Sequence, residues 1–270
     1  MGSRRTTQYV LHPRFDPQTL TSRSQKGIWA GWKDAPLSEL GQKQAHAVGA
    51  SLSTTRLTHI YASPLQRAHS TGRAVHSAQP HAPPFSVNPK LREQYFGVAE
   101  GHRWVATIPQ GRTPDELIHE GIYPVLSGRT AKFPGGESLE DLARRAEEAI
   151  EECVVRHLDE GKDIHVALAS HGLCISELVP ALLRLDPETR KDVSYAGLLN
   201  TAWHRATVER REDGSGLRVV VTLVNQAEHL QGLVNAEPVE EDTSSSEARA
   251  FFGGDASKLE SAHPATNAEI

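Results

Sequence analysis

One short apolar run, Ile164 to Ala169, constrains the fold of this chain more than any other feature. It is bounded by Gly161 and Ser170, and a helical pattern follows it. A compact apolar run of this length is typical of a strand buried on both faces of a sheet. Such strands occur in parallel sheets that carry helices on both sides, so the run predicts an α/β fold.

The segments around this run alternate between strand and helix patterns. Other strands are predicted at residues 7–11, 58–62, 85–87, 202–209 and 217–224. Helices are predicted at residues 37–52, 65–77, 114–120, from 138 onward and at 175–184. The Asp213-Gly214 turn predicts that the last two strands form a hairpin. Residues 12–36 and 89–135 lack periodicity beyond the helix at 114–120, and we expect the stretch 102–133 to lie over a site.

The chain is long enough for one domain with a sizeable core. It has 270 residues, of which 38% are hydrophobic and 23% are charged, as in globular proteins. We predict a single three-layer α/β/α domain with a mostly parallel sheet over residues 1–235. After about residue 235 the composition becomes acidic and rich in Ser, Ala and Gly, which predicts a disordered tail at 236–270.

Charge and hydropathy exclude several classes of function. The net charge of −5 provides no basic field for a nucleic acid partner. No apolar run is long enough to cross a membrane, and the basic N-terminus lacks the apolar stretch of a signal peptide. Two cysteines cannot form a disulfide framework, so we expect a reducing, cytoplasmic compartment. The oligomeric state is left open.

Polar residues follow four of the predicted strands, where α/β folds place their sites. His12 follows the first strand, Arg67 lies in the first turn of the helix after the second, Glu93 follows the third, and His171 follows the buried run. An Arg at a helix start can bind a phosphate bidentately. Taken singly, each of these residues is more often an ordinary surface or ion-paired side chain.

Their joint order and local contexts resemble the phosphoglycerate mutase-like branch of the histidine phosphatase superfamily. The resemblance covers roughly residues 27 to 230, and it is specific only when its parts are taken together. The matching segments are 31–38, Leu40-Gly41 with Gln44-Ala45, 60–68, Leu91-Arg92-Glu93, Phe96-Gly97, Glu100-Gly101, 134–138, Ser170-His171-Gly172, Asn200-Thr201 and Asn225 with His229-Leu230.

The resemblance implies a phosphatase that needs no metal or other cofactor and acts on a small phosphorylated metabolite. In that family a His after the first strand becomes phosphohistidine, cationic side chains bind the phosphate, and an acid protonates the leaving oxygen. Carried over by position, Arg67 resembles a phosphate-binding Arg, Glu93 the proton donor and His171 the second, phosphate-binding His.

The first motif departs from the family pattern. The family has Arg-His-Gly, whereas this chain has Leu11-His12-Pro13 followed by an unusually long segment. The nucleophile is therefore His12 in an altered loop, or the N-terminus is degenerate or stems from a wrongly joined first exon. An ungapped alignment would place the nucleophile near Gln18, which cannot act as one. Arg14 or Arg23 could supply the missing positive charge at the phosphate.

Two functions from different classes follow from this departure. The first is an active phosphatase, with hydrolysis weakly favoured over mutase action. The alternative is a catalytically impaired protein of the same fold that acts as a binding module. A metal hydrolase is disfavoured, because no Cys/His cluster with ligand spacing and no His-Glu-x-x-His pattern occurs among the 14 His.

Overall fold

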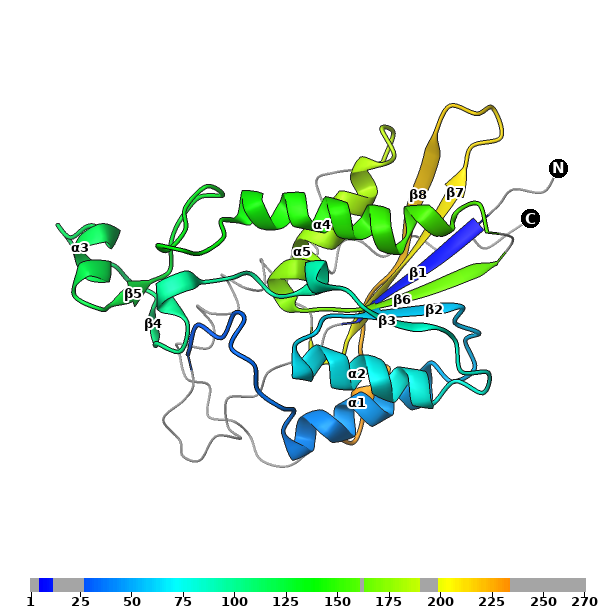
Figure 1. Ribbon diagram of the computed structural model, residues 1–270, viewed down its shortest axis with the longest axis horizontal. Helices are drawn as coiled ribbons and strands as arrows, with labels where there is room; N and C mark the ends of the chain where they lie inside the picture. The colour runs from blue at the N-terminus through cyan, green and yellow to red at the C-terminus, as the bar shows by residue number, and fades with distance from the viewer. Residues whose placement is uncertain (1–4, 12–26, 161–162, 190–198, 234–270) are drawn as a thin grey trace, which may run out of the picture.

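A six-stranded sheet of order β3-β2-β6-β1-β7-β8 forms the centre of the fold (Figure 1). In the computed structural model, β3, β2, β6 and β1 are parallel, whereas β7 is antiparallel to β1 and β8 to β7. The predicted mostly parallel sheet and its closing hairpin are thus confirmed. The strands are β1 (Arg5–Leu11), β2 (His59–Ala62), β3 (Phe85–Val87), β6 (Ile164–Ala169), β7 (Trp203–Arg210) and β8 (Leu217–Gln226).

The structure describes residues 5–11, 27–160, 163–189 and 199–233, and of 5–11 it describes the backbone alone. The predictions for His12, Arg14, Gln18 and Arg23, and for the tail at 236–270, lie outside these residues. Among the described residues no helix is long and apolar enough to cross a membrane.

Helices cover both faces of the sheet, as the three-layer prediction requires. α1 (Glu39–Ser51) and α2 (Gln66–Ser77) lie on one face, and α4 (Leu139–Cys153) and α5 (Gly172–Arg184) on the other (Figure 1). The period-two alternation of a strand divides the core accordingly. Ile60 and Ala62 are buried in the cluster with α1 and α2, whereas Tyr61 joins the cluster with α4 and α5.

Most helix ends follow from local sequence. Ser138 accepts the Asp141 amide at 3.1 Å, and the Asp141 carboxylate accepts the Ser138 amide at 3.1 Å, which completes the predicted capping box of α4. One boundary differs: α5 begins at Gly172, one turn before the predicted start at residue 175. The reason is a cap supplied by a distant segment, described below.

The stretch between β3 and α4 holds more structure than its sequence predicts. The helix expected at 114–120 is present as α3 (Pro114–His119). The prediction of an otherwise irregular stretch was wrong, because β4 (Trp104–Val105) and β5 (Tyr123–Pro124) pair in parallel and short 3-10 helices occur at η2 (Pro89–Leu91) and η3 (Gly97–Ala99). Two further 3-10 helices, η4 (Val155–His157) and η5 (Glu228–Leu230), follow α4 and β8, and η5 contacts α1.

The segment with α3, β4 and β5 extends from the side of the sheet where the parallel strands end (Figure 1). It is joined to the rest of the fold around Trp29, whose indole donates to the Tyr123 carbonyl at 3.1 Å. The Trp29 ring also packs against Phe96 and Phe133, at centroid distances of 4.6 and 5.3 Å. This aromatic contact fixes the extension relative to the loops described below.

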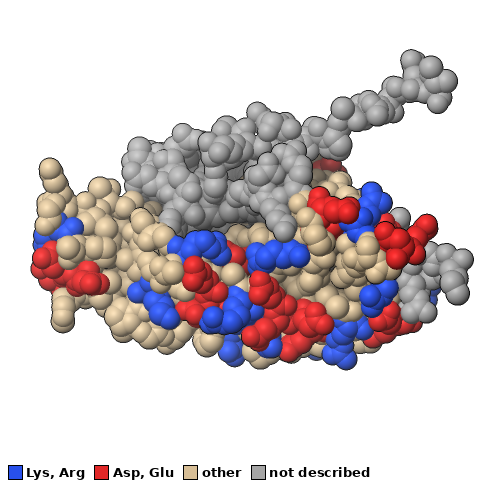
Figure 2. Space-filling view, turned by 90° about the horizontal axis from the view of Figure 1, so that it is seen from above, with Lys and Arg blue, Asp and Glu red and all other residues tan. Residues whose placement is uncertain are grey.

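The surface of the α4 layer carries charges of both signs. Lys90 pairs with Glu148 and Glu152, and Arg184 with Glu147. Basic and acidic side chains are interspersed over the face drawn in Figure 2, so this face presents no single-sign field.

Candidate active site

The register of the sheet brings three strand ends together. Ala169 at the end of β6 lies beside Leu11 at the end of β1 on one side and Ala62 at the end of β2 on the other. The chain continues from these ends to Ser63 after β2 and to Ser170 and His171 after β6. Polar groups that follow parallel strands are thereby placed at one edge of the sheet.

Arg67 and His171 are in direct contact at this edge. The Arg67 Nε donates to His171 Nδ1 at 3.2 Å, and His171 Nε2 lies 2.9 Å from the Ser63 hydroxyl. Because Nδ1 accepts from the guanidinium, the proton of the neutral imidazole is on Nε2 and faces Ser63. Arg67 and His171 are each 2% exposed, so their positions are fixed by surrounding groups.

The Glu93 carboxyl group lies at the N-terminus of α5, the helix that begins immediately after His171. Its Oε1 accepts the amides of Gln94 and Cys174 at 2.9 and 3.0 Å, and its Oε2 accepts the Leu173 amide at 3.3 Å. His171 is the N-cap residue of α5 and makes no side-chain cap bond. The Glu93 carboxylate therefore takes the place of a local cap, and the helix end favours its negative charge.

The loop that carries Glu93 is held from the α4 side by Arg145. The Arg145 guanidinium donates to the carbonyls of Lys90, Arg92 and Glu93 at 2.8, 2.8 and 2.9 Å. It also forms a two-point ion pair with Glu137 at 2.9 and 2.7 Å. We call these two residues the Arg145–Glu137 clamp, because together they fix the backbone of the segment that ends in Glu93.

The loop 31–34 closes the site from a second side. Arg67 donates to the carbonyls of Gly31 and Lys33 at 2.7 and 3.2 Å. The Trp32 indole donates to the Glu93 carbonyl at 2.7 Å, and the Trp32 amide donates to Glu100 at 2.6 Å. Gly31 has φ +46°, and a Cβ there would meet the Glu100 carboxylate at 2.0 Å, so this approach requires glycine.

Burial and neighbouring charges shift the pKa values of this group in opposite directions. Burial raises the pKa of Glu93 above its ordinary value, although the amide donors and Arg67 act against the rise. Burial lowers the pKa of Arg67, and the nearby carboxylates of Glu93, Asp34 and Glu100 oppose that change. Arg67 stays cationic at neutral pH, whereas the protonated form of Glu93 persists to higher pH than in an exposed carboxyl.

The structure thus brings together three of the five predicted site residues. Arg67 contacts His171, and Glu93 binds the helix that His171 begins. Both nitrogens of His171 have protein partners and a guanidinium does not ligate metals, so this set is suited to an anion. Their catalytic roles stay predictions, as do those of His12 and Arg14, which lie outside the described residues.

Several residues that shape the site escaped the reasoning from sequence. Ser63, Glu100 and Glu137 stand inside the matching segments but were given no role. Arg144 and Arg145 are adjacent in the predicted helix, and nothing in the local sequence distinguishes one from the other. Only the fold shows that Arg145 turns toward the Glu93 loop, whereas Arg144 pairs with Asp141 at the exposed surface.

Comparison with known proteins fits this geometry. The family model of the histidine phosphatase superfamily (branch 1) matches residues 19–217. The chain belongs to the histidine phosphatase superfamily. The match begins after His12, so it includes Arg67, Glu93 and His171 but not the first predicted motif.

Two relatives in sequence are named as phosphoglycerate mutases. A probable phosphoglycerate mutase (GpmB) of Yersinia enterocolitica is 31% identical over 60% of this chain and 69% of its own length. A 2,3-bisphosphoglycerate-dependent phosphoglycerate mutase of Gloeobacter violaceus is 28% identical over 74% and 88%.

Solved structures of other proteins share the fold of this chain. A mycobacterial glucosyl-3-phosphoglycerate phosphatase in complex with VO3 is 26% identical with a TM-score of 0.61, covering 82% of this chain and 99% of that one. A structure described as mycobacterial hydrolase 1 is 25% identical with a TM-score of 0.62, covering 83% and 99%.

Proposed function

We propose that this protein is a phosphomonoester hydrolase that acts on a small phosphorylated metabolite without a metal ion. The contact between Arg67 and His171, at the strand ends that Glu93 also borders, carries the proposal. A guanidinium and an imidazole side by side suit the charge of a phosphoryl group, and a half-buried carboxyl suits proton transfer. The phosphatase and hydrolase among the solved structures support hydrolysis, whereas the two sequence relatives named above are mutases.

The reaction proceeds in two displacements. A nitrogen of His12, the residue that directly follows the end of β1, attacks phosphorus, the bond to the leaving oxygen breaks, and Glu93 gives that oxygen its proton. Water then attacks the phosphohistidine, its proton passes to the Glu93 carboxylate, and the P–N bond breaks to release phosphate. Arg67 and His171 stabilise the negative charge on the phosphoryl oxygens in both steps.

The position of the acidic proton follows from the hydrogen bonds of Glu93. Oε1 accepts two amides at 2.9 and 3.0 Å, whereas Oε2 accepts a single longer bond of 3.3 Å. The less occupied oxygen, Oε2, is therefore the one that carries the proton to the leaving group. The extension with α3, β4 and β5 lies on the same side of the sheet and is the segment that would select the organic part of the substrate (Figure 1).

Hydrolysis of p-nitrophenyl phosphate by the full chain tests the proposal. We expect turnover by the unmodified protein and its loss in His12→Ala and His171→Ala, with activity retained in His46→Ala, whose exposed imidazole is hydrogen-bonded to the Gln42 carbonyl of its own helix. An acid-labile phosphoenzyme should form in the unmodified protein but not in His12→Ala. An inactive protein that still binds vanadate would overturn the proposal in favour of a binding module.

A further inference from the structure

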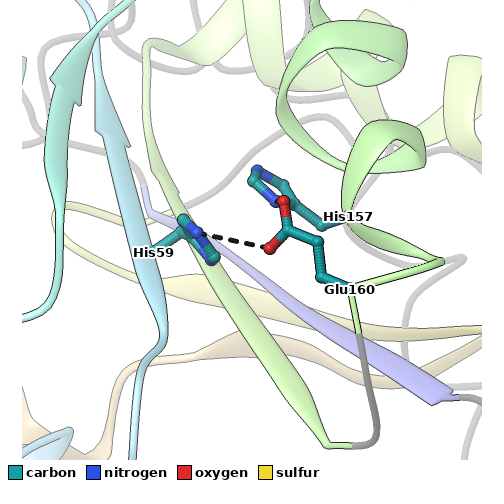
Figure 3. A group of neighbouring side chains, drawn as sticks. All are labelled: His59, His157 and Glu160. Atoms are coloured by element: carbon teal, nitrogen blue, oxygen red, sulfur yellow. Dashed lines mark hydrogen bonds and ion pairs between the residues drawn. The ribbon is translucent and has the colours of Figure 1, made fainter.

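A second cluster of chemistry-bearing side chains lies away from the candidate active site. His59, at the amino end of β2, faces His157 and Glu160 in the turn after α4 (Figure 3). One ligand atom from each of the three lies within 4.8 Å of the others. Arg67 and Ser63 are at the opposite, carboxyl end of β2, so this His-His-Glu triad belongs to a different edge of the sheet.

We propose that the His-His-Glu triad binds one divalent transition-metal ion, Zn²⁺ by its donor set. Two imidazole nitrogens and one carboxylate oxygen are a common ligand set for Zn²⁺, with water completing the coordination. The triad is reachable from solvent, since the side chain of Glu160 is 43% exposed and that of His59 is 20% exposed, whereas His157 is 3% exposed and fixed in the core.

The hydrogen bonds of Thr58 determine the tautomer of His59. The Thr58 hydroxyl donates to the His165 carbonyl at 3.0 Å, so it must accept from His59 Nδ1, which lies 3.2 Å away. In the neutral ring this leaves the proton on Nδ1 and a lone pair on Nε2. Nε2 is the atom that faces Glu160, at 3.6 Å, and is therefore ready to ligate a metal.

His157 is held by a different hydroxyl. Its Nε2 is 2.7 Å from the buried Tyr61 hydroxyl, and its Nδ1 is 2.7 Å from Glu160 Oε1. A carboxylate only accepts hydrogen bonds, so Nδ1 carries the proton here and Tyr61 donates to Nε2. A metal ion at Nδ1 would displace that proton to Nε2, where the Tyr61 hydroxyl can accept the hydrogen bond instead. Metal-bound histidines commonly have their second nitrogen held by such an outer partner, which orients the ring.

The distances within the triad fit a metal ion after a small movement. A tetrahedral Zn²⁺ site with bonds of about 2.0–2.1 Å holds its donor atoms roughly 3.3 Å apart. Glu160 Oε1 lies 2.7 Å from His157 Nδ1, and Glu160 Oε2 lies 3.6 Å from His59 Nε2, so the carboxylate has to turn for one oxygen to share an ion with both rings. The imidazoles overlap at a centroid distance of 4.0 Å, so His59, the more exposed ring, has to tilt for both nitrogens to point at one ion.

Zinc titration of the chelator-treated full chain, against a competing chromophoric chelator, tests this site. We expect one tightly bound Zn²⁺ per chain and a visible absorption band when Co²⁺ replaces it. Tyr61→Phe removes the outer partner and should weaken binding by about 10–100-fold. His59→Ala and Glu160→Gln should weaken it further, whereas His46→Ala should leave it unchanged.

Circular dichroism shows whether each variant is folded, and Tyr61→Phe keeps the packing of the core ring. Stoichiometric binding that survives in both His59→Ala and Glu160→Gln would overturn the proposal, because the ion would then sit elsewhere. A folded protein that fails to compete with a weak chelator would also overturn it. Phosphatase activity should not change in His59→Ala, so this test stands apart from that of the active site.

Discussion

Replacing Arg145 by Met should destabilise the protein by about 2–4 kcal/mol. The substitution keeps the aliphatic length but leaves the Glu137 carboxylate and the carbonyls of Lys90, Arg92 and Glu93 without their donor. Removing one partner of a buried ion pair costs roughly 3–5 kcal/mol. The side chains of Arg145 and Glu137 are 14% and 19% exposed, so water replaces part of the loss and the lower estimate applies.

The more informative variant is Arg145→Lys, because it separates positioning from stability. Lys keeps the charge but cannot bind three carbonyls and both carboxylate oxygens in one plane. The Glu93 loop should shift, and a displacement of about 1 Å at a catalytic group can cost roughly 10²-fold in rate. An alkyl phosphate needs a proton on its leaving oxygen, whereas p-nitrophenolate leaves as an anion.

We therefore expect kcat on an alkyl phosphate to fall by about 10²-fold in Arg145→Lys, and kcat on p-nitrophenyl phosphate to fall far less. Steady-state kinetics with both substrates measures the difference, and urea unfolding measures stability. Arg144→Lys is the matched control, since Arg144 is on the same helix but 67% exposed. Equal losses on the two substrates would refute the reasoning, because they would show that Arg145 does not act through the acid.

Three further predictions follow. Glu93→Gln should lower alkyl phosphate turnover by about 10²–10⁴-fold and abolish the alkaline decline of kcat/KM, since that decline reports loss of the acid's proton; an unchanged pH profile would contradict this. Asp186→Asn should cost about 2 kcal/mol in urea unfolding at pH 7. Burial raises the pKa of Asp186, but hydrogen bonds from Val219, Glu188 and Arg211 outweigh burial and lower the pKa below 3.8. The stability difference between the variant and the unmodified protein should therefore shrink as the pH falls below 3.8, and a difference that did not shrink would contradict this explanation. Gly97→Ala should destabilise by more than about 1 kcal/mol, since φ is +55° and a Cβ would lie 2.3 Å from the Pro134 carbonyl; a neutral result in thermal unfolding would contradict it.

The layers of the fold could be predicted because they rest on local patterns. The apolar run of β6, the capping box at Ser138 and the turn at Asp213 each act over a few residues, and each is present as expected. The pairing of β4 with β5 could not be predicted, because two-residue strands have no periodicity. They are held instead by a segment distant in sequence, since the Trp104 amide donates to the Gly27 carbonyl at 2.8 Å and the Trp29 indole donates to the Tyr123 carbonyl at 3.1 Å.

In the candidate site, too, some residues could be predicted from the sequence and others could not. Arg67 and His171 could be proposed because Arg67 lies in the first turn of the helix after β2, His171 lies just after β6, and parallel strands end at one edge. The residues that position the site could not be predicted, because their roles depend on contacts with segments distant in sequence. Arg145 is an example, since it differs from Arg144 only in the side of the helix it occupies. The His-His-Glu triad was missed for the same reason, since His59 and His157 belong to separate segments and show no ligand spacing.

The early start of α5 has a consequence for the chemistry. Glu93 caps this helix with its carboxylate, and a helix N-terminus favours the charged form of an acid. Taken alone, that contact would leave Glu93 a poor proton donor at neutral pH. Burial acts the other way and raises its pKa. The acid strength of Glu93 is thus a balance between amide donors that stabilise its charge and surroundings that penalise that charge. Changes that admit water to the Glu93 carboxyl should therefore lower its pKa and impair the acid step.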